Sequence, residues 1–289
     1  VIIVSVGGNM KRRIIYLSFI AILSFCFLLS GCNSAISISA LHIGGSEISK
    51  DAFLAEIAER EAYNDRQFIS EQWYRVKMQT LSDKESSDNK NSDNSYLSIS
   101  GNVMLSSLQF RSKFRFSVNS ESFNSQDDGT EITKNKLSGQ VTCVDGEIYT
   151  KLKDTDYQKN SGGIKKSDNV TYFCDTLTDN SDINDIIELI KNFDVAALLD
   201  GYIDSYRFET MSFFRVPDGY AFSLSGADKV QLVVTYMEGS SRVKTLSLYL
   251  FTDKSSDSLA SSTSTKLEIS ASTSRRISAP SNKDKYKMR

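Results

Sequence analysis

Apolar and polar side chains alternate along residues 108–118, and this pattern limits the fold more than any other in the chain. Successive side chains of a β-strand point to opposite faces, so the alternation predicts a strand with one buried face and one wet face. A sheet with one wet face is typical of antiparallel pairing. The apolar face would carry Leu108, Phe110, Phe114, Phe116 and Val118, and the wet face Gln109, Arg111, Lys113, Arg115 and Ser117.

A tight hairpin is predicted at Asp145-Gly146. A type I′ turn needs positive φ at both central residues, and Asp-Gly is one of the few pairs that tolerate this. A two-residue turn also fixes the register of the strands that it joins. The expected partners are Cys143 with Ile148, Val141 with Thr150, Gly139 with Leu152 and, on the other face, Thr142 with Tyr149.

Two helices are predicted. The first begins near Ser49, a residue type that caps helix N-termini, and is expected to bury Phe53, Leu54, Ile57 and Ala58 as one apolar stripe. The second spans about Asp182–Leu199 and is expected to end at Gly201, since glycine favours the conformation that terminates helices. Its apolar face carries Ile183, Ile186, Ile187, Ile190, Phe193, Leu198 and Leu199.

Further strands are indicated by the same alternation or by turn residues between apolar runs. Together the elements predict an α+β fold: a large curved antiparallel β-sheet, or half-barrel, with an N-terminal helix and an inserted central helix packed on its concave face. The further strands are Phe68–Met78, Leu97–Leu105, Val170–Leu177, Tyr206–Val216, Tyr220–Leu224, Val230–Met237, Arg242–Phe251 and Lys266–Ser272.

The amino terminus resembles the signal peptide of a bacterial lipoprotein. Three basic residues precede an uncharged run, which closes with Leu29-Ser30-Gly31-Cys32 and so resembles a lipobox. The resemblance implies cleavage before Cys32 and a diacylglycerol on its thiol. The alternative is a transmembrane helix, because the run is about long enough to span a bilayer. Met10 is the natural start of such a signal, which places residues 1–9 upstream of the coding region.

The expected organisation has four parts: a signal peptide over 1–31, a lipidated cysteine and tether over 32–48, one β-rich domain over 49–274, and a basic disordered tail over 275–289. The polar stretch Ser82–Ser95 is expected to be a surface loop. Cleavage leaves 258 of the 289 residues and removes three positive charges from a formal net charge of −2, which leaves −5. An acidic domain gives no electrostatic reason to expect nucleic acid as a partner.

The order helix, strands, helix, strands behind a lipobox resembles the carrier lipoproteins of the LolA and LppX/LprG type. The local similarity is the run from Val144 to Leu152, and Ile186 to Gly201 falls where those proteins have a helical insert. In that family a curved sheet and helices enclose an apolar cavity for acyl chains. The resemblance implies a cavity lined by Phe110, Phe114, Phe116, Ile186, Ile187, Ile190 and Phe193, and ordinary core packing is the alternative reading of the same residues.

Cys143 and Cys174 are the cysteines left to the expected mature domain. Export to an oxidising space favours a disulfide between them. In a simple meander, however, the strand after Gly146 lies between them and holds them about 9.5 Å apart, beyond the roughly 7 Å that a disulfide spans. The sequence leaves both outcomes open.

The sequence gives little support for a catalytic site or a metal site. The one histidine, His42, lies in the tether, so histidine triads and histidine-ligated metals are not expected. Ser241 and Lys244 match a Ser-x-x-Lys spacing, but at a hairpin turn. Ser82–Ser95 lacks the glycine and glutamate frame of a calcium loop. The chain is therefore expected to use no cofactor or metal and not to be an enzyme.

Two functions remain. The first is a membrane-anchored extracytoplasmic lipoprotein, held by lipid on Cys32, that binds or carries an apolar or lipid ligand between the sheet and the helix Asp182–Leu199. The second is a protein-interaction or envelope-sensor domain with a filled core and no small ligand. A large dry cavity would favour the first and a solid core the second.

Overall fold

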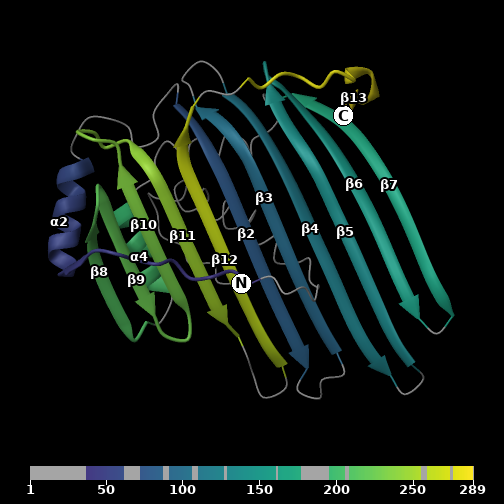
Figure 1. The fold of residues 1–289 in the computed structure, drawn as a ribbon, viewed down its shortest axis with the longest axis horizontal. Coiled ribbons are helices and arrows are strands. Elements are labelled where there is room, and N and C mark those ends of the chain that lie inside the picture. The colour runs from purple at the N-terminus through teal and green to yellow at the C-terminus, as the bar shows by residue number, and fades with distance from the viewer. Residues whose placement is uncertain are drawn as a thin grey trace, which may run out of the picture.

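The computed structural model describes residues 37–61, 72–86, 91–105, 110–126, 129–160, 162–176, 195–205, 208–254, 259–273 and 276–288. The proposed signal peptide and Cys32 lie outside these ranges. Within them the chain forms a sheet of 13 strands in the order β1-β8-β9-β10-β11-β12-β2-β3-β4-β5-β6-β7-β13 (Figure 1). All neighbouring strands are antiparallel except β13 and β7, which are parallel.

Strands β2 to β7 and β12 are unusually long, whereas those at the β1–β10 end are short. The strands are β1 Ser46–Ile48, β2 Gln72–Ser86, β3 Asn91–Leu105, β4 Phe110–Gln126, β5 Gly129–Val144, β6 Glu147–Asn160, β7 Gly163–Thr176, β8 Thr210–Val216, β9 Gly219–Ser225, β10 Lys229–Tyr236, β11 Val243–Asp253, β12 Leu259–Ser272 and β13 Lys287–Met288. The described helices are α2 Lys50–Glu61, α4 Val195–Ser205 and the short 3₁₀ turn η2 Lys283–Lys285.

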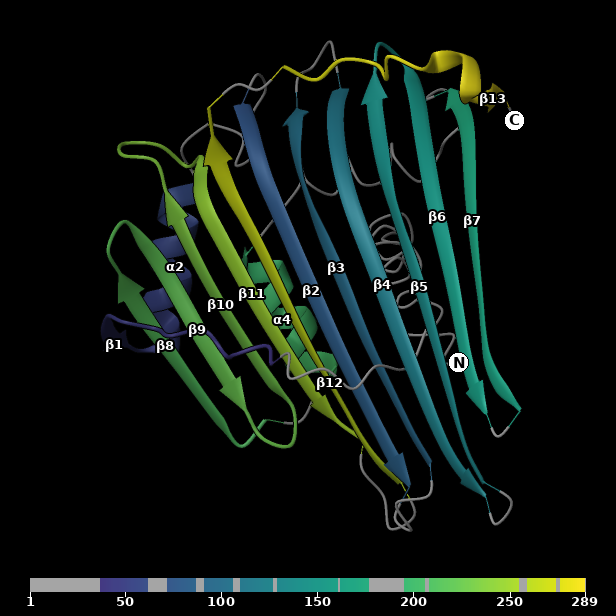
Figure 2. The ribbon, with the colours of Figure 1, turned by 45° about the vertical axis from the view of Figure 1, so that its right-hand side comes forward.

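The predicted fold class is wrong. The described residues form chiefly one extended antiparallel sheet, with α2 and α4 as short additions, rather than an α+β half-barrel wrapped around a central helix. Figure 2 shows both helices behind the β8–β12 end of the sheet and not along its length. The prediction underestimated the length of the strands because it relied on the alternation of apolar residues. These hairpins continue through polar sequence.

Ser82–Ser95 shows this most clearly. The stretch is not a surface loop: β2 continues to Ser86, β3 starts at Asn91, and Ser82 pairs with Ser95. The same polar half of β2 also pairs with β12 on its other side, where Thr80 Oγ1 lies 3.1 Å from Thr265 Oγ1 and Thr263 Oγ1 donates to Ser82 Oγ at 3.2 Å. Such cross-strand pairs stabilise a sheet by about 0.2–1 kcal/mol each, and the backbone ladder adds to them.

The predicted hairpin is confirmed. Asp145 has φ 54° and Gly146 φ 80°, as a type I′ turn requires. Each expected pair occurs in the register between β5 and β6, from Cys143 with Ile148 to Gly139 with Leu152, and Thr142 lies opposite Tyr149. The strand predicted by the alternation of 108–118 is also present as β4, and it extends eight residues beyond Val118 to Gln126.

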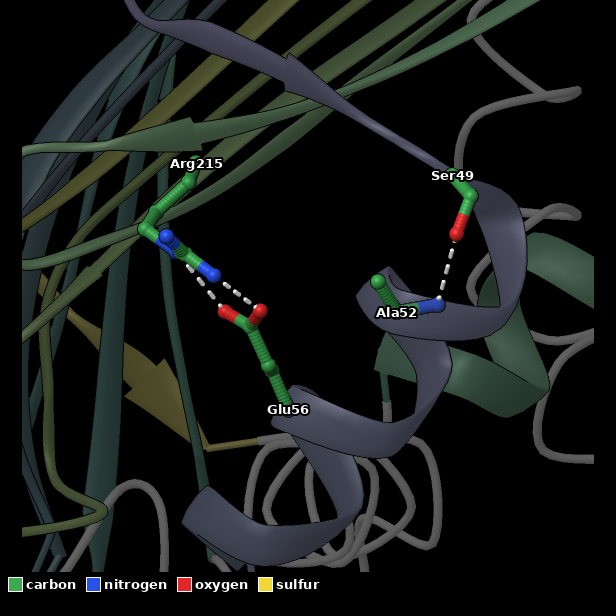
Figure 3. A network of polar contacts seen from close by, with 4 residues as sticks. All are labelled: Ser49, Ala52, Glu56 and Arg215. Carbon is green, nitrogen blue, oxygen red and sulfur yellow. Dashed lines mark hydrogen bonds and ion pairs between the residues drawn. The ribbon is translucent and has the colours of Figure 1, made fainter.

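Helix α2 forms as predicted at its N-terminus. Ala52 N donates to Ser49 Oγ at 3.2 Å, which caps the helix, and Phe53 and Ile57 are fully buried (Figure 3). Ala58 is exposed, so the predicted stripe is narrower than expected. Helix α2 is joined to the sheet by Arg215 of β8, whose Nε donates to Glu56 Oε2 at 2.9 Å.

Helix α4 is displaced from the predicted second helix. Residues 177–194 lie outside the described ranges, and the described helix begins at Val195 and continues to Ser205. Gly201 lies within the helix and does not end it. Val195 and Leu199 are fully buried against the same cluster as α2. Helices α2 and α4 therefore close one face of the short-strand end with a packed apolar core.

Two apolar clusters lie on opposite faces of the sheet. The larger one lies on the face that carries α2 and α4, which we call the core face. Its strand residues alternate with those of the opposite, outer face: in β2, for example, Tyr74, Val76 and Met78 face the core. The smaller cluster covers one end of the outer face and contains Trp73, Val144, Tyr149, Cys174 and Ile277.

The prediction of a disordered tail is wrong for the described residues 276–288. Ile277 is buried in the smaller cluster, and the Tyr286 ring lies 5.4 Å from that of Tyr149 and 5.3 Å from that of Tyr172. Lys283 Nζ lies 3.3 Å from Glu147 Oε2. The segment crosses one end of the sheet to β13 (Figures 1 and 2). Its composition is polar, but the aromatic side chains of the sheet give it a surface on which to pack.

Candidate functional site

The predicted cavity wall lies on the core face. Phe114 and Val118 pack against the larger cluster, and Phe116 is half-buried on the same face. Each ring covers a glycine on a neighbouring strand: a Cβ added at Gly139 would lie 2.6 Å from Phe116 Cζ, and one at Gly101 would overlap Phe114. These phenylalanines therefore fill space that the glycines leave open. For Phe110 only the backbone, at the start of β4, is described.

The helical half of the predicted cavity cannot be placed. Ile186, Ile187, Ile190 and Phe193 lie outside the described residues. The described end of that segment, in α4, packs Val195 and Leu199 into the core rather than lining a hollow. Among the described residues, no group of three or more His, Cys, Asp and Glu is arranged to hold a metal ion, and no helix is long and apolar enough to cross a membrane.

Cys143 and Cys174 do not form a disulfide: both thiols are free and buried. Strand β6 lies between them, as the meander argument required. The register adds that Cys143 lies opposite Ile148 on the core face, whereas Cys174 lies opposite Tyr149 on the outer face. Burial raises the pKa of the Cys143 thiol to about 11 and also raises that of Cys174. Neither thiol is suited to act as a nucleophile near neutral pH.

Two hollows of the described structure bear on the predicted cavity, and neither of them lies between the sheet and α4. The first, of about 440 Å³, lies where β2 begins and β12 ends, and Met237, Glu238 and Lys244 also line it. Ser241, the serine of the Ser-x-x-Lys spacing, does not line it and is fully buried. The second, of about 500 Å³, we call the basic groove; it is lined by Arg75, Lys77, Ser100, Gly101, Asn102, Lys113, Arg115, Arg276 and Ile277.

The sheet register builds the basic groove from two parallel rows of side chains on the outer face. In the first row Arg75 of β2, Asn102 of β3 and Lys113 of β4 are direct cross-strand partners. In the second, two residues along each strand, Lys77, Ser100 and Arg115 are partners. Neighbouring strands lie about 4.8 Å apart, so in each row the two cations are about 9.5 Å apart, with the polar residue of β3 between them.

A fifth cation comes from the folded tail. Ile277, buried in the smaller cluster, fixes the chain at the end of the outer face, and its neighbour Arg276 lines the groove. None of the five cations forms an ion pair within the described part of the chain. The acid nearest in register is Glu268, opposite Lys77, and its carboxylate lies 3.1 Å from Lys266 Nζ. The groove is therefore a concentration of uncompensated positive charge.

The floor of the groove contains an unsatisfied acceptor. Asn102 Oδ1 is shielded from solvent and has no hydrogen-bond partner. Buried polar atoms in proteins are nearly always paired, so this oxygen is an acceptor that the donor group of a ligand can satisfy. The groove can therefore accept an anion through its cations and a hydrogen-bond donor at its floor.

Sequence reasoning missed this groove. The sequence did contain a sign of the groove: basic residues occupy alternate, solvent-facing positions in two strands. These are Arg75 and Lys77 in one strand and Lys113 and Arg115 in the other. The alternation identified them as exposed but not as neighbours. The net charge of the whole chain is negative, so it gave no indication of this local excess of positive charge.

Comparisons with known proteins give little guidance. No protein family model matches the chain, and no curated protein matches it. Among solved structures, one match is the attachment invasion locus protein Ail of Yersinia pestis, which is 6% identical with a TM-score of 0.15 and covers 70% of this chain and 98% of that chain. A similarity of that size does not define the shape or the activity of this protein.

The described structure does not support the expectation of a lipid-binding carrier. The two hollows named above lie at the ends of β2 and β12 and on the outer face, and the described part of α4 is packed core. The antiparallel sheet that the expectation included is present.

Proposed function

We propose that this protein is exported, is held on a membrane of the cell envelope by lipid on Cys32, and binds an anionic partner in the basic groove. The observation that carries the proposal is the two-row arrangement of Arg75, Lys77, Lys113 and Arg115, unpaired within the described structure, in a chain whose formal net charge is −2. Arginine and lysine in such an arrangement bind phosphate and carboxylate groups through charge-assisted hydrogen bonds.

The path of the tether supports a site close to the anchoring membrane. Leu41 N donates to Gln231 Oε1 at 2.9 Å, and Gln231 alternates with core residues of β10, so it lies on the outer face. Figure 1 shows the segment crossing in front of β9–β11. Ser37, the first described residue, is five residues beyond Cys32, which limits the distance between them to about 17 Å. The groove and the departing tether therefore share one face of the sheet.

Retention on a cation exchanger tests the binding site. The full chain, purified in a nonionic detergent at neutral pH and low ionic strength, is expected to be retained although its net charge is negative. Lys113→Glu with Arg115→Glu should abolish retention, whereas Lys50→Glu with Lys254→Glu, the same change in net charge outside the groove, should not. Equal loss in both double variants would show that total charge and not the groove is responsible.

Metabolic labelling with a fatty-acid probe tests the anchor. Wild-type protein is expected to take up the probe and Cys32→Ala to take up none. Cys26→Ala is the matched control, because Cys26 lies in the predicted signal peptide and should not affect labelling. Labelling of Cys32→Ala at the wild-type level would refute the anchor.

A further inference from the structure

We infer that the basic groove binds a polyol phosphate chain, that is, a phosphodiester polymer whose units carry free hydroxyl groups. This inference rests on the proposed anion binding and adds the chemistry of the ligand. Each row of the groove repeats the same unit, a cation of β2, a polar residue of β3 and a cation of β4. A ligand that repeats an anionic group and a hydroxyl group matches two such rows in succession.

The floor residues select for a hydroxylated anion. Asn102 Oδ1 is an acceptor without a partner, and a bare phosphate chain, which has only acceptors near neutral pH, cannot satisfy it. A polyol hydroxyl can donate to it once the long side chains of Arg75 and Lys113 turn to the phosphates and uncover the amide. Ser100, in the second row, can both donate and accept.

The shape and composition of the groove favour a free chain over two other polyanions. The site is an open groove of about 500 Å³, whose floor an extended chain can follow and of which a flat bilayer would reach only the rim. Among the described residues no aromatic side chain lines it, so this lining lacks the stacking surfaces with which proteins hold single-stranded nucleic acid. Its apolar lining residue, Ile277, is buried in the smaller cluster.

Calorimetric titration of the detergent-purified full chain distinguishes these ligands. The probes are a synthetic glycerol phosphate oligomer, an inorganic polyphosphate of equal charge and phosphatidylglycerol vesicles. Wild-type protein is expected to bind the oligomer about fivefold to tenfold more tightly than the polyphosphate, the effect of one added hydrogen bond. Tighter binding to the vesicles than to the oligomer would replace the inferred ligand by a membrane surface.

Variants assign the selectivity to named residues. Asn102→Leu should remove the preference for the oligomer and leave polyphosphate binding unchanged, while Asn94→Leu, on the same face of β3 outside the groove, should change neither. Arg75→Gln with Lys113→Gln should weaken the binding of both the oligomer and the polyphosphate. Equal affinity of wild-type protein for oligomer and polyphosphate would overturn this inference but keep the proposed anion binding, and failure to bind any of the three probes would overturn both.

Discussion

Arg215 of β8 donates to both carboxylate oxygens of Glu56 on α2, although 159 residues separate the two in sequence (Figure 3). The pair fixes the helix against the edge of the sheet that β8 and β1 form. The hydrogen bond from Arg215 is the main reason that the pKa of the Glu56 carboxyl lies below its ordinary value, against a smaller opposing effect of burial.

This pair predicts a pH-dependent contribution to stability. A carboxyl whose pKa is lowered by folding stabilises the fold above its unfolded value and loses this contribution as the pH falls through the folded value. Glu56→Gln should therefore lower the Tm at pH 7, and the difference from wild type should vanish well below pH 4.5, the ordinary value. Glu59→Gln, an exposed neighbour, should show no difference at either pH. A Tm difference that is constant with pH would contradict the assignment.

Phe53 is expected to be the main apolar anchor of α2. Its side chain is fully buried, and its ring lies 5.0 Å from that of Phe213 and 6.2 Å from that of Phe222. Phe53→Ala should lower the free energy of unfolding by about 3–5 kcal/mol, because it removes buried area and leaves a cavity. Denaturant melts measure this. Glu59→Ala, exposed on the same helix, should stay within about 0.5 kcal/mol of wild type.

Two glycines should respond to alanine in opposite directions. A Cβ at Gly101 would overlap the Lys113 carbonyl oxygen and lie 2.8 Å from Phe114 Cα, so Gly101→Ala should destabilise by about 1–3 kcal/mol or more. Gly201 lies inside α4 with nothing within 4 Å of an added Cβ, so Gly201→Ala should stabilise by about 0.5–1 kcal/mol. Destabilisation by Gly201→Ala would favour the original prediction that the helix ends there.

The two buried thiols should be inert in the native protein. Because burial raises the pKa of Cys143 to about 11 and raises that of Cys174, little reactive thiolate is present at neutral pH. Alkylation followed by peptide mass spectrometry should leave both cysteines unmodified in the native state and modify both after denaturation without reductant. Cysteines that react only after reduction would reveal a disulfide.

The groove cations should reduce the stability of the unliganded protein. Lys113 and Arg115 lie two residues apart on one face of β4 without an ion pair in the described structure, and like charges at this distance repel one another. Lys113→Gln should therefore raise the Tm by about 1–3 °C at low ionic strength and by less at high salt, where charges are screened. Lys254→Gln, an exposed lysine at the end of β11, should have no such effect. A drop in Tm for Lys113→Gln would argue that this lysine has a structural partner.

The sequence determined the features that depend on neighbours within a few residues. Alternation from 108 to 118 assigned Phe114 and Arg115 to opposite faces, because side-chain direction in a strand has a period of two. Asp145-Gly146 determined the β5–β6 register, since few residue pairs tolerate positive φ. Ser49 determined where α2 begins, because its hydroxyl accepts from a backbone N–H of the first turn.

Only the tertiary structure decided what depends on the order of strands. The length of β2 could not be inferred from apolar periodicity, because its polar half pairs with β12, where Thr80 contacts Thr265 from a segment 185 residues away. The tail folds because Tyr149 and Tyr172 provide a surface for Tyr286. The basic groove exists because β3 places Arg75 opposite Lys113 across Asn102. Electrostatic energy depends on the distances between charges, and the net charge of a sequence contains no information about those distances.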